Sequence, residues 1–171
     1  MDNTRVWVQT MLTTTPSRWL VLTGSMPPEL LVFRPTAKDW SAVECLQHMI
    51  DVEKVFQYRL TCFLEGKPFQ GYNPDVEGTR IGDQSPTSLA LEFESLREQS
   101  LQSLEKLHST DLERRVRHAE LGPVTLGEMV NQWAAHDLNH TIQAERALMQ
   151  PFIDSCGPWS VYFVDHVVHE R

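Results

Sequence analysis

Hydrophobic residues recur three or four positions apart in four long stretches of this chain, whereas strict alternation of apolar and polar residues is scarce. Spacing of this kind places the apolar side chains on one face of an α-helix. The pattern predicts helices over about residues 4–23, 41–64, 86–108 and 125–149. We therefore expect a mostly helical domain.

Local sequence signals mark the ends of these helices. Ser41 with Glu44, and Thr125 with Glu128, each form the pattern of a capping box, in which two side chains satisfy backbone N–H groups at a helix start. Pro151 is expected to stop the last helix at about residue 149, because a proline disfavours helical geometry in the residue before it.

The connections between the predicted helices are longer than the few residues that join helices in simple bundles. The segment 66–85, rich in Gly, Pro, Asn and Asp, looks like a shaped loop that covers a site. Residues 116–124, around Gly122 and Pro123, are predicted to form a short hairpin. The tail from Pro151 to the end contains many large side chains, and we expect it to pack back on the helices.

Composition narrows the possible partners. A chain of 171 residues fits a single domain, 1–171, and its net charge of −8 disfavours binding to nucleic acid or to anionic lipid. We expect no secretion signal and no membrane span, since no run of 18 apolar residues occurs. The negative charge therefore favours a small-molecule or protein partner. Cys45, Cys62 and Cys156 form no CxxC pair, which favours a reducing, cytoplasmic location.

Two histidines, His136 and His140, stand one helical turn apart in the last predicted helix. Positions i and i+4 differ by roughly 40° around a helix axis, so both imidazoles leave the same face and can reach one metal ion. Asp137 lies on the same apolar arc. Buried ionisable groups need partners, and either a divalent cation or an ordinary hydrogen-bond network would satisfy them.

A third candidate ligand comes from another helix. His48 lies at the edge of the apolar arc of the second predicted helix and could face the bundle axis. Helical bundles commonly build metal sites from side chains that project inward from facing helices. A histidine at the edge of the core, hydrogen-bonded to a carbonyl, is the alternative interpretation.

The string from His136 to Gln143, HDLNHTIQ, together with the string WSAVECLQH that ends at His48, resembles the DinB-like (YfiT-type) family of metal-dependent enzymes. The resemblance spans most of the chain. It implies an all-α fold, a four-helix bundle, and a metal centre in which His48, His136 and His140 are the three ligands. Relatives include thiol-dependent transferases and isomerases, so the resemblance also implies a low-molecular-weight thiol as a partner.

Three histidine ligands leave at least one position open on a tetrahedral ion, as in catalytic sites. A metal there makes both hydrolysis and thiol transfer available, on a small electrophilic substrate. Zn or Ni is the expected metal, with Fe as an alternative, because imidazole suits all three. A noncatalytic bundle that binds metal or a ligand is the rival function, and purely structural histidines are a third interpretation.

Neighbouring side chains have competing interpretations. Asp137 could orient a histidine or form a helix salt bridge, and Gln143 could hydrogen-bond a ligand or face solvent. Glu44 could act as a general base, although its capping box already explains it, and Cys45 is either a fourth ligand or a core residue. Exposed apolar surface on the long helices could also support a homodimer, which the sequence does not decide.

Overall fold

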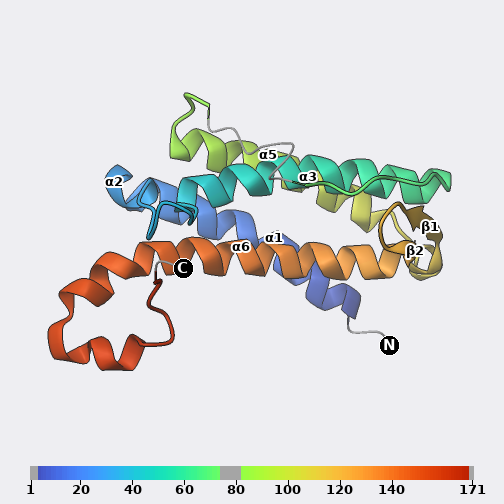
Figure 1. Ribbon diagram of the computed structural model, residues 1–171. Helices are drawn as coiled ribbons and strands as arrows, with labels where there is room; N and C mark the ends of the chain where they lie inside the picture. Colours follow the sequence, from blue (N-terminus) through green and yellow to red (C-terminus); the bar gives the residue numbers. More distant parts are fainter. Residues whose placement is uncertain (1–3, 74–81, 170–171) are drawn as a thin grey trace.

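The computed structural model describes residues 4–73 and 82–169 and contains a bundle of four long helices with a small hairpin at one end (Figure 1). The all-α bundle expected from the sequence is confirmed. The central part of the expected loop 66–85, residues 74–81, lies outside the described residues. The long helices are α1 (Thr4–Ser25), α3 (Ala42–Glu65), α5 (Pro86–Glu105) and α6 (Leu126–Ser155).

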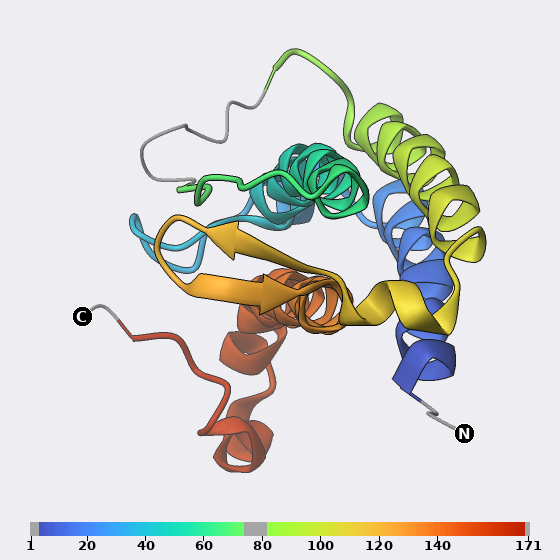
Figure 2. The same ribbon diagram turned by 90° about the vertical axis from the view of Figure 1, so that its right-hand side faces the viewer.

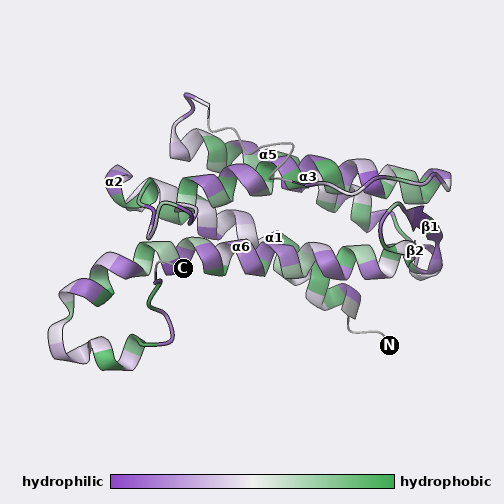
Figure 3. Cartoon of the chain, in the orientation of Figure 1, coloured by the Kyte–Doolittle hydropathy of each residue, from purple (hydrophilic) through white to green (hydrophobic). Residues whose placement is uncertain are grey.

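The four helices form a closed square. Both α1 and α3 contact α5 and α6, so α3 and α6 are direct neighbours, as the view along the bundle in Figure 2 shows. Hydrophobic residues are distributed along all four helices (Figure 3), and their buried members form two core clusters. Within the described residues, no helix combines the length and apolar character that a membrane crossing requires. The largest fully buried aromatic side chains are Trp19, Trp133, Phe56, Phe63 and Phe93.

Both predicted capping boxes are present. The Ser41 hydroxyl accepts a hydrogen bond from the Glu44 backbone N–H, and the Glu44 carboxylate accepts one from the Ser41 N–H. Thr125 and Glu128 make the same reciprocal pair at the start of α6. These caps fix where the two histidine-bearing helices begin.

The predicted end of the last helix at Pro151 is wrong, because α6 continues through this proline to Ser155. A proline removes one backbone hydrogen bond from a helix but does not by itself determine where the chain turns. Continuing the helix buries Ile153, which is 5% exposed. The helix ends instead before Gly157, whose positive φ of 58° suits a glycine.

The third predicted helix ends at Glu105, three residues before the expected end at His108. The His108 backbone N–H donates to the Asp111 carboxylate at 2.8 Å, which starts the short 3₁₀ helix η1 (Ser109–Glu113). A competing cap of this kind takes the chain out of the α-helix.

The predicted hairpin is confirmed, with β1 (Arg115–His118) antiparallel to β2 (Gly122–Thr125). Phe69, just after α3, joins it through a parallel bridge to His118. The Phe69 N–H donates to the Arg117 carbonyl at 3.2 Å, and the Ala119 N–H donates to the Phe69 carbonyl at 3.1 Å. The hairpin therefore ties the end of α3 to the start of α6.

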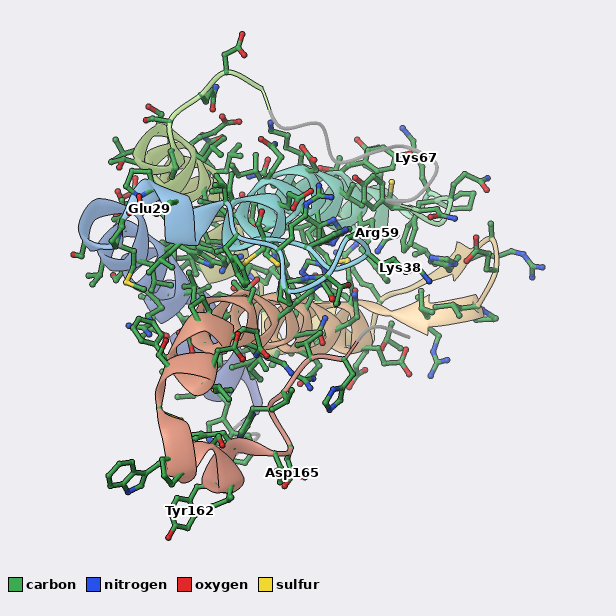
Figure 4. All side chains as sticks on the ribbon, turned by 60° about the vertical axis from the view of Figure 1, so that its left-hand side comes forward. Glu29, Lys38, Arg59, Lys67, Tyr162 and Asp165 are labelled. Carbon is green, nitrogen blue, oxygen red and sulfur yellow. The ribbon has the colours of Figure 1, made fainter. Side chains whose placement is uncertain are left out.

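Like η1, two further short helices were absent from the sequence-based expectation, α2 (Pro28–Leu31) and the C-terminal 3₁₀ helix η2 (Gly157–Phe163). One part of the C-terminal tail is exposed, and the part that follows it contacts α6. Tyr162 is 77% exposed and extends away from the bundle in Figure 4. The chain then returns to α6, where Arg146 and Gln150 donate hydrogen bonds to the His166 carbonyl, each at 3.0 Å.

Candidate metal centre

The three histidines singled out in the sequence lie together between α3 and α6. His48 comes from α3, His136 and His140 come from α6, and one ring nitrogen of each lies within 4.8 Å of the others. The Nε2 atoms of His48 and His136 are 3.1 Å apart. The ring centroid of His140 is 4.5 Å from that of His48 and 4.4 Å from that of His136. We call these residues the histidine cluster.

The histidine cluster is electrically neutral near pH 7. Burial, with a smaller effect of His140, lowers the pKa of His48 to about 4. Burial and the neighbouring histidines lower the pKa of His136 to about 3. Burial also lowers the pKa of His140, against an opposing hydrogen bond to Gln143. Neutral imidazoles carry the lone pairs that metal ligands need.

The spacing of the nitrogen atoms fits one small cation. Tetrahedral zinc binds imidazole nitrogen at about 2.1 Å, which separates two such ligands by about 3.4 Å. The 3.1 Å between the Nε2 atoms of His48 and His136 is close to that value. Nδ1 of His48 is buried and makes no hydrogen bond with the described residues, which leaves Nε2 as the atom that faces His136. The spacing and the neutral imidazoles suit a transition metal.

Gln143 fixes the orientation of His140. Its amide oxygen Oε1 lies 2.9 Å from His140 Nδ1, which therefore carries the proton and donates it. This tautomer leaves the lone pair on Nε2. The alternative in which Gln143 simply faces solvent does not fit this contact, since the side chain is half-buried.

Aromatic rings surround the histidine cluster on several sides. Trp40, just before α3, stacks on His140 at a centroid distance of 5.9 Å. Tyr72, from the segment after α3, stacks on His48 at 6.4 Å. Phe56 meets the edge of His136 at 5.8 Å. Trp40 appeared in the sequence analysis only within the string that ends at His48, and Tyr72 was not predicted, because both rings belong to connections that no helical periodicity describes.

Asp137 faces away from the histidines into a second buried polar group. Its two carboxylate oxygens accept hydrogen bonds from Arg97 of α5 at 2.6 and 3.0 Å. Arg97 also donates to both carboxylate oxygens of Glu53, at 2.9 and 2.8 Å. These contacts fit the salt-bridge interpretation of Asp137. The ion pair joins α5 to α6, however, and does not lie within one helix.

We call Arg97, Glu53, Asp137 and Trp133 the arginine cluster. The Trp133 indole N–H donates to Glu53 at 3.0 Å, and Arg97 donates to the Leu12 carbonyl at 2.9 Å. Burial raises the pKa of Asp137, although Arg97 opposes that effect. Burial lowers the pKa of Arg97, but the charges of Asp137 and Glu53 outweigh it and the pKa is raised. Of its members, Asp137 is the one that was singled out in the sequence, because the others come together only through the packing of distant helices.

Two further candidates from the sequence, Glu44 and Cys45, are not part of the histidine cluster. The Glu44 carboxylate accepts hydrogen bonds from Ser41 and Arg34, and although burial raises its pKa, these bonds lower it overall. Cys45 is fully buried, and burial raises the pKa of its thiol to about 12. Among the described residues, Cys45 is not part of the group that could hold a metal.

Comparisons with known proteins agree with this architecture. Among solved structures, YfiT from Bacillus subtilis, described as a probable metal-dependent hydrolase with an unusual four-helix bundle topology, has the same fold. The TM-score is 0.74 at 15% identity, over 86% of this chain and 87% of that chain. A search of curated proteins gives no significant match. Residues 11–144 match the sequence model of the DinB superfamily. Because this match covers most of the chain, the protein belongs to the DinB superfamily.

Proposed function

We propose that this protein is a metal-dependent enzyme that acts on a small electrophilic substrate, with His48, His136 and His140 as the metal ligands. The observation that carries the proposal is the position of three neutral imidazole nitrogens within 4.8 Å of one another. Hydrolysis is the first candidate reaction, in keeping with the description of the similarly folded YfiT as a probable hydrolase. Thiol transfer from a low-molecular-weight thiol is the alternative.

A divalent cation would supply Lewis acidity, which polarises a substrate oxygen and favours deprotonation of water or of a thiol. The protein's own side chains prepare for this chemistry. Gln143 holds the tautomer of His140, and the rings of Trp40 and Tyr72 pack around the cluster and reduce the access of water. Zinc or nickel is the proposed metal and iron the alternative, because three imidazoles suit each of them.

The remaining parts of the proposal concern setting and assembly. Cys45, Cys62 and Cys156 are all free thiols, which supports the proposed cytoplasmic location. Leu138 and Ile142 are 44% and 61% exposed on α6, which supports a proposed homodimer. The net charge of −8 supports a small-molecule substrate over nucleic acid.

Elemental analysis of untagged protein, before and after chelation, tests the metal site. We expect close to one equivalent of a transition metal, and the His140→Ala variant should lose it while remaining folded. The matched control is His166→Ala, because His166 is exposed and only its backbone makes the hydrogen bonds found for it. Less than about a tenth of an equivalent in the native protein, with no uptake on reconstitution, would contradict the site.

A second measurement separates an enzyme from a binding protein. Metal-loaded protein is incubated with an activated ester and with an alkyl halide, each with and without a low-molecular-weight thiol. Hydrolysis predicts turnover of the ester without thiol, whereas thiol transfer predicts a thioether product only when thiol is present. Metal uptake without turnover of either compound would favour the noncatalytic binding protein.

A further inference from the structure

Pro16 leaves a gap in the backbone hydrogen bonds of α1. A proline has no N–H, so it cannot donate to the carbonyl of the residue four positions earlier, which is Leu12. Leu12 is fully buried, and a buried carbonyl without a partner costs free energy. Arg97 of α5 supplies the missing donor, because its Nη1 donates to the Leu12 oxygen at 2.9 Å. The guanidinium is thereby anchored to α1.

Arg97 uses all of its donors within this buried space. A guanidinium has five N–H groups. One donates to Leu12, two donate to the Glu53 carboxylate of α3, and two donate to the Asp137 carboxylate of α6. The three charged side chains are only 1–2% exposed. Paired bonds of this kind fix both the distance and the orientation of the two carboxylates, which a lysine ammonium cannot do.

The place of Arg97 in the bundle makes these bonds a link between all four long helices. Both α5 and α6 contact α1 and α3, and α5 and α6 occupy opposite corners of the square (Figure 2). The Arg97 side chain therefore crosses the interior from α5 toward α6 and bonds to α1 and α3 as well. Through Glu53 and Asp137 it joins α3 to α6.

These two helices carry the histidine cluster, and the carboxylates bound by the guanidinium lie close to it in the chain. Asp137 directly follows His136 on α6, and Glu53 comes five residues after His48 on α3. The Trp133 indole of α6 donates to Glu53 at 3.0 Å and adds a direct bond between the two helices. Sliding or rotation of α3 against α6 would therefore break paired bonds in the arginine cluster while it separated the histidines.

We propose that Arg97 is a positioning residue for the histidine cluster. By binding one carboxylate on α3 and one on α6, it holds the two helices at the spacing that assembles the cluster, and the Leu12 carbonyl fixes the guanidinium itself. All five N–H groups are used in these bonds, so Arg97 acts on the histidines through the helices and not by a hydrogen bond to them. That the assembled histidines hold a metal rests on the proposed function above.

The first measurement uses metal-free full-length protein and does not depend on metal binding. The ring centroids of His48 and His140 are 4.5 Å apart, so their ring protons should give a nuclear Overhauser effect (NOE). Arg97→Lys keeps the positive charge but loses the paired bonds. A displacement of about 0.5 Å, which is the tolerance of functional sites, would lower this NOE by about half because the effect falls with the sixth power of the distance. Glu53→Gln replaces one acceptor oxygen and should lower the NOE by a smaller amount.

The matched control is Leu89→Ala. Leu89 is buried on α5, eight residues before Arg97, and belongs to the core cluster that contains no member of the arginine cluster. Its truncation leaves a cavity and should lower the urea midpoint at least as much as Glu53→Gln does. The NOE between the His48 and His140 rings should nevertheless keep its native intensity. If Arg97 served stability alone, the NOE would follow the urea midpoint across all these variants.

The second measurement titrates Co²⁺, whose visible absorption reports the geometry of its ligands, into the same proteins. Arg97→Lys should lower Co²⁺ affinity about tenfold and change the absorption bands, whereas Leu89→Ala should change neither. If Arg97→Lys does not fold, Glu53→Gln decides both measurements, with effects in the same direction.

Three results would overturn the positioning role. They are an unchanged NOE in the folded Arg97 and Glu53 variants, an equal loss of the NOE in Leu89→Ala, and an unchanged Co²⁺ spectrum in those Arg97 and Glu53 variants when the native protein binds Co²⁺. A native protein that binds no Co²⁺ or other metal, but whose NOE responds as expected, would contradict the proposed function and support the positioning role of Arg97.

Discussion

Two buried polar clusters lie next to each other on α6, and they differ in how their side chains are satisfied. In the arginine cluster, Arg97 donates hydrogen bonds to two carboxylates and a backbone carbonyl, and the Trp133 indole N–H donates to Glu53. In the histidine cluster, two ring nitrogens face each other at 3.1 Å and the buried Nδ1 of His48 makes no hydrogen bond with the described residues.

We propose that this difference separates a supporting cluster from a functional one. A buried charge network whose members satisfy one another stabilises a particular packing and has no need of a ligand. A buried group of neutral imidazoles whose ring nitrogens lie within 4.8 Å of one another can be completed by one bound cation. His136 and Asp137 are consecutive residues, so one helix turn supplies a member to each cluster.

The largest expected effect concerns the arginine cluster. Arg97→Met leaves Glu53 and Asp137 buried without their cation, and we expect the free energy of unfolding to fall by about 3–5 kcal/mol. Urea denaturation of the metal-free protein measures it. Lys54→Met, which breaks a surface ion pair with Glu92, should cost less than about 1 kcal/mol. Equal losses of unfolding free energy in the two variants would show that the arginine cluster stabilises the fold no more than a surface ion pair does.

The histidine cluster should respond in the opposite way. His48→Gln removes one ligand and should lower metal affinity by more than about 100-fold, while the metal-free protein changes by less than about 1 kcal/mol in its free energy of unfolding. Metal competition with a chromophoric chelator and urea denaturation give the two values. A loss of stability as large as that of Arg97→Met would mean that these histidines are structural.

A smaller effect is expected from the residue that orients His140. Gln143→Leu removes the acceptor at Nδ1 and should lower metal affinity by about tenfold. Gln143→Glu keeps an acceptor oxygen and should retain most of the affinity, so the pair of variants isolates the hydrogen bond. Chelator competition provides the measurement, and equal affinities for the two variants would contradict the positioning role.

The last effect concerns pH. Well above pH 6.5, His48 and His136 are neutral in the folded and unfolded states and contribute little to pH dependence. Between about pH 7 and about 4, the unfolded chain binds protons that the folded protein excludes, so stability falls as pH falls. We expect these two histidines together to account for about 3–4 kcal/mol between pH 7 and pH 5 in metal-free protein. The comparison is with a His48→Gln, His136→Gln double variant, whose urea midpoint should change less over this range.

The sequence predicts those parts of the site that depend on local spacing. His136 and His140 share a helix face because they are four residues apart, and Gln143 reaches His140 because it follows three residues later. The hairpin and both capping boxes were likewise readable, since their partners are close in the chain. In each case the contact joins residues that are close in the chain, so the local backbone geometry determines it.

Contacts between distant segments were not predictable in the same way. Arg97 pairs with Asp137, which is 40 positions away in the chain, and with Glu53, which is 44 positions away. Its burial depends on how α5 packs against α1 and α3. The stacking of Trp40 and Tyr72 on the histidines depends on connections whose paths no periodic pattern describes. The end of α6 was misread because the burial of Ile153 outweighs a local helix-breaking signal.

Thr125 is the last residue of β2 and also the N-cap of α6, so no spacer separates the strand from the helix. Adding or deleting one residue at this junction would rotate the whole of α6 by about 100° relative to the hairpin. Such a change would turn His136 and His140 away from His48 while leaving every helix intact. Among relatives that keep this site, insertions and deletions should therefore be rarer at this junction than at the hairpin turn, residues 119–121, where an added residue leaves the orientation of α6 unchanged.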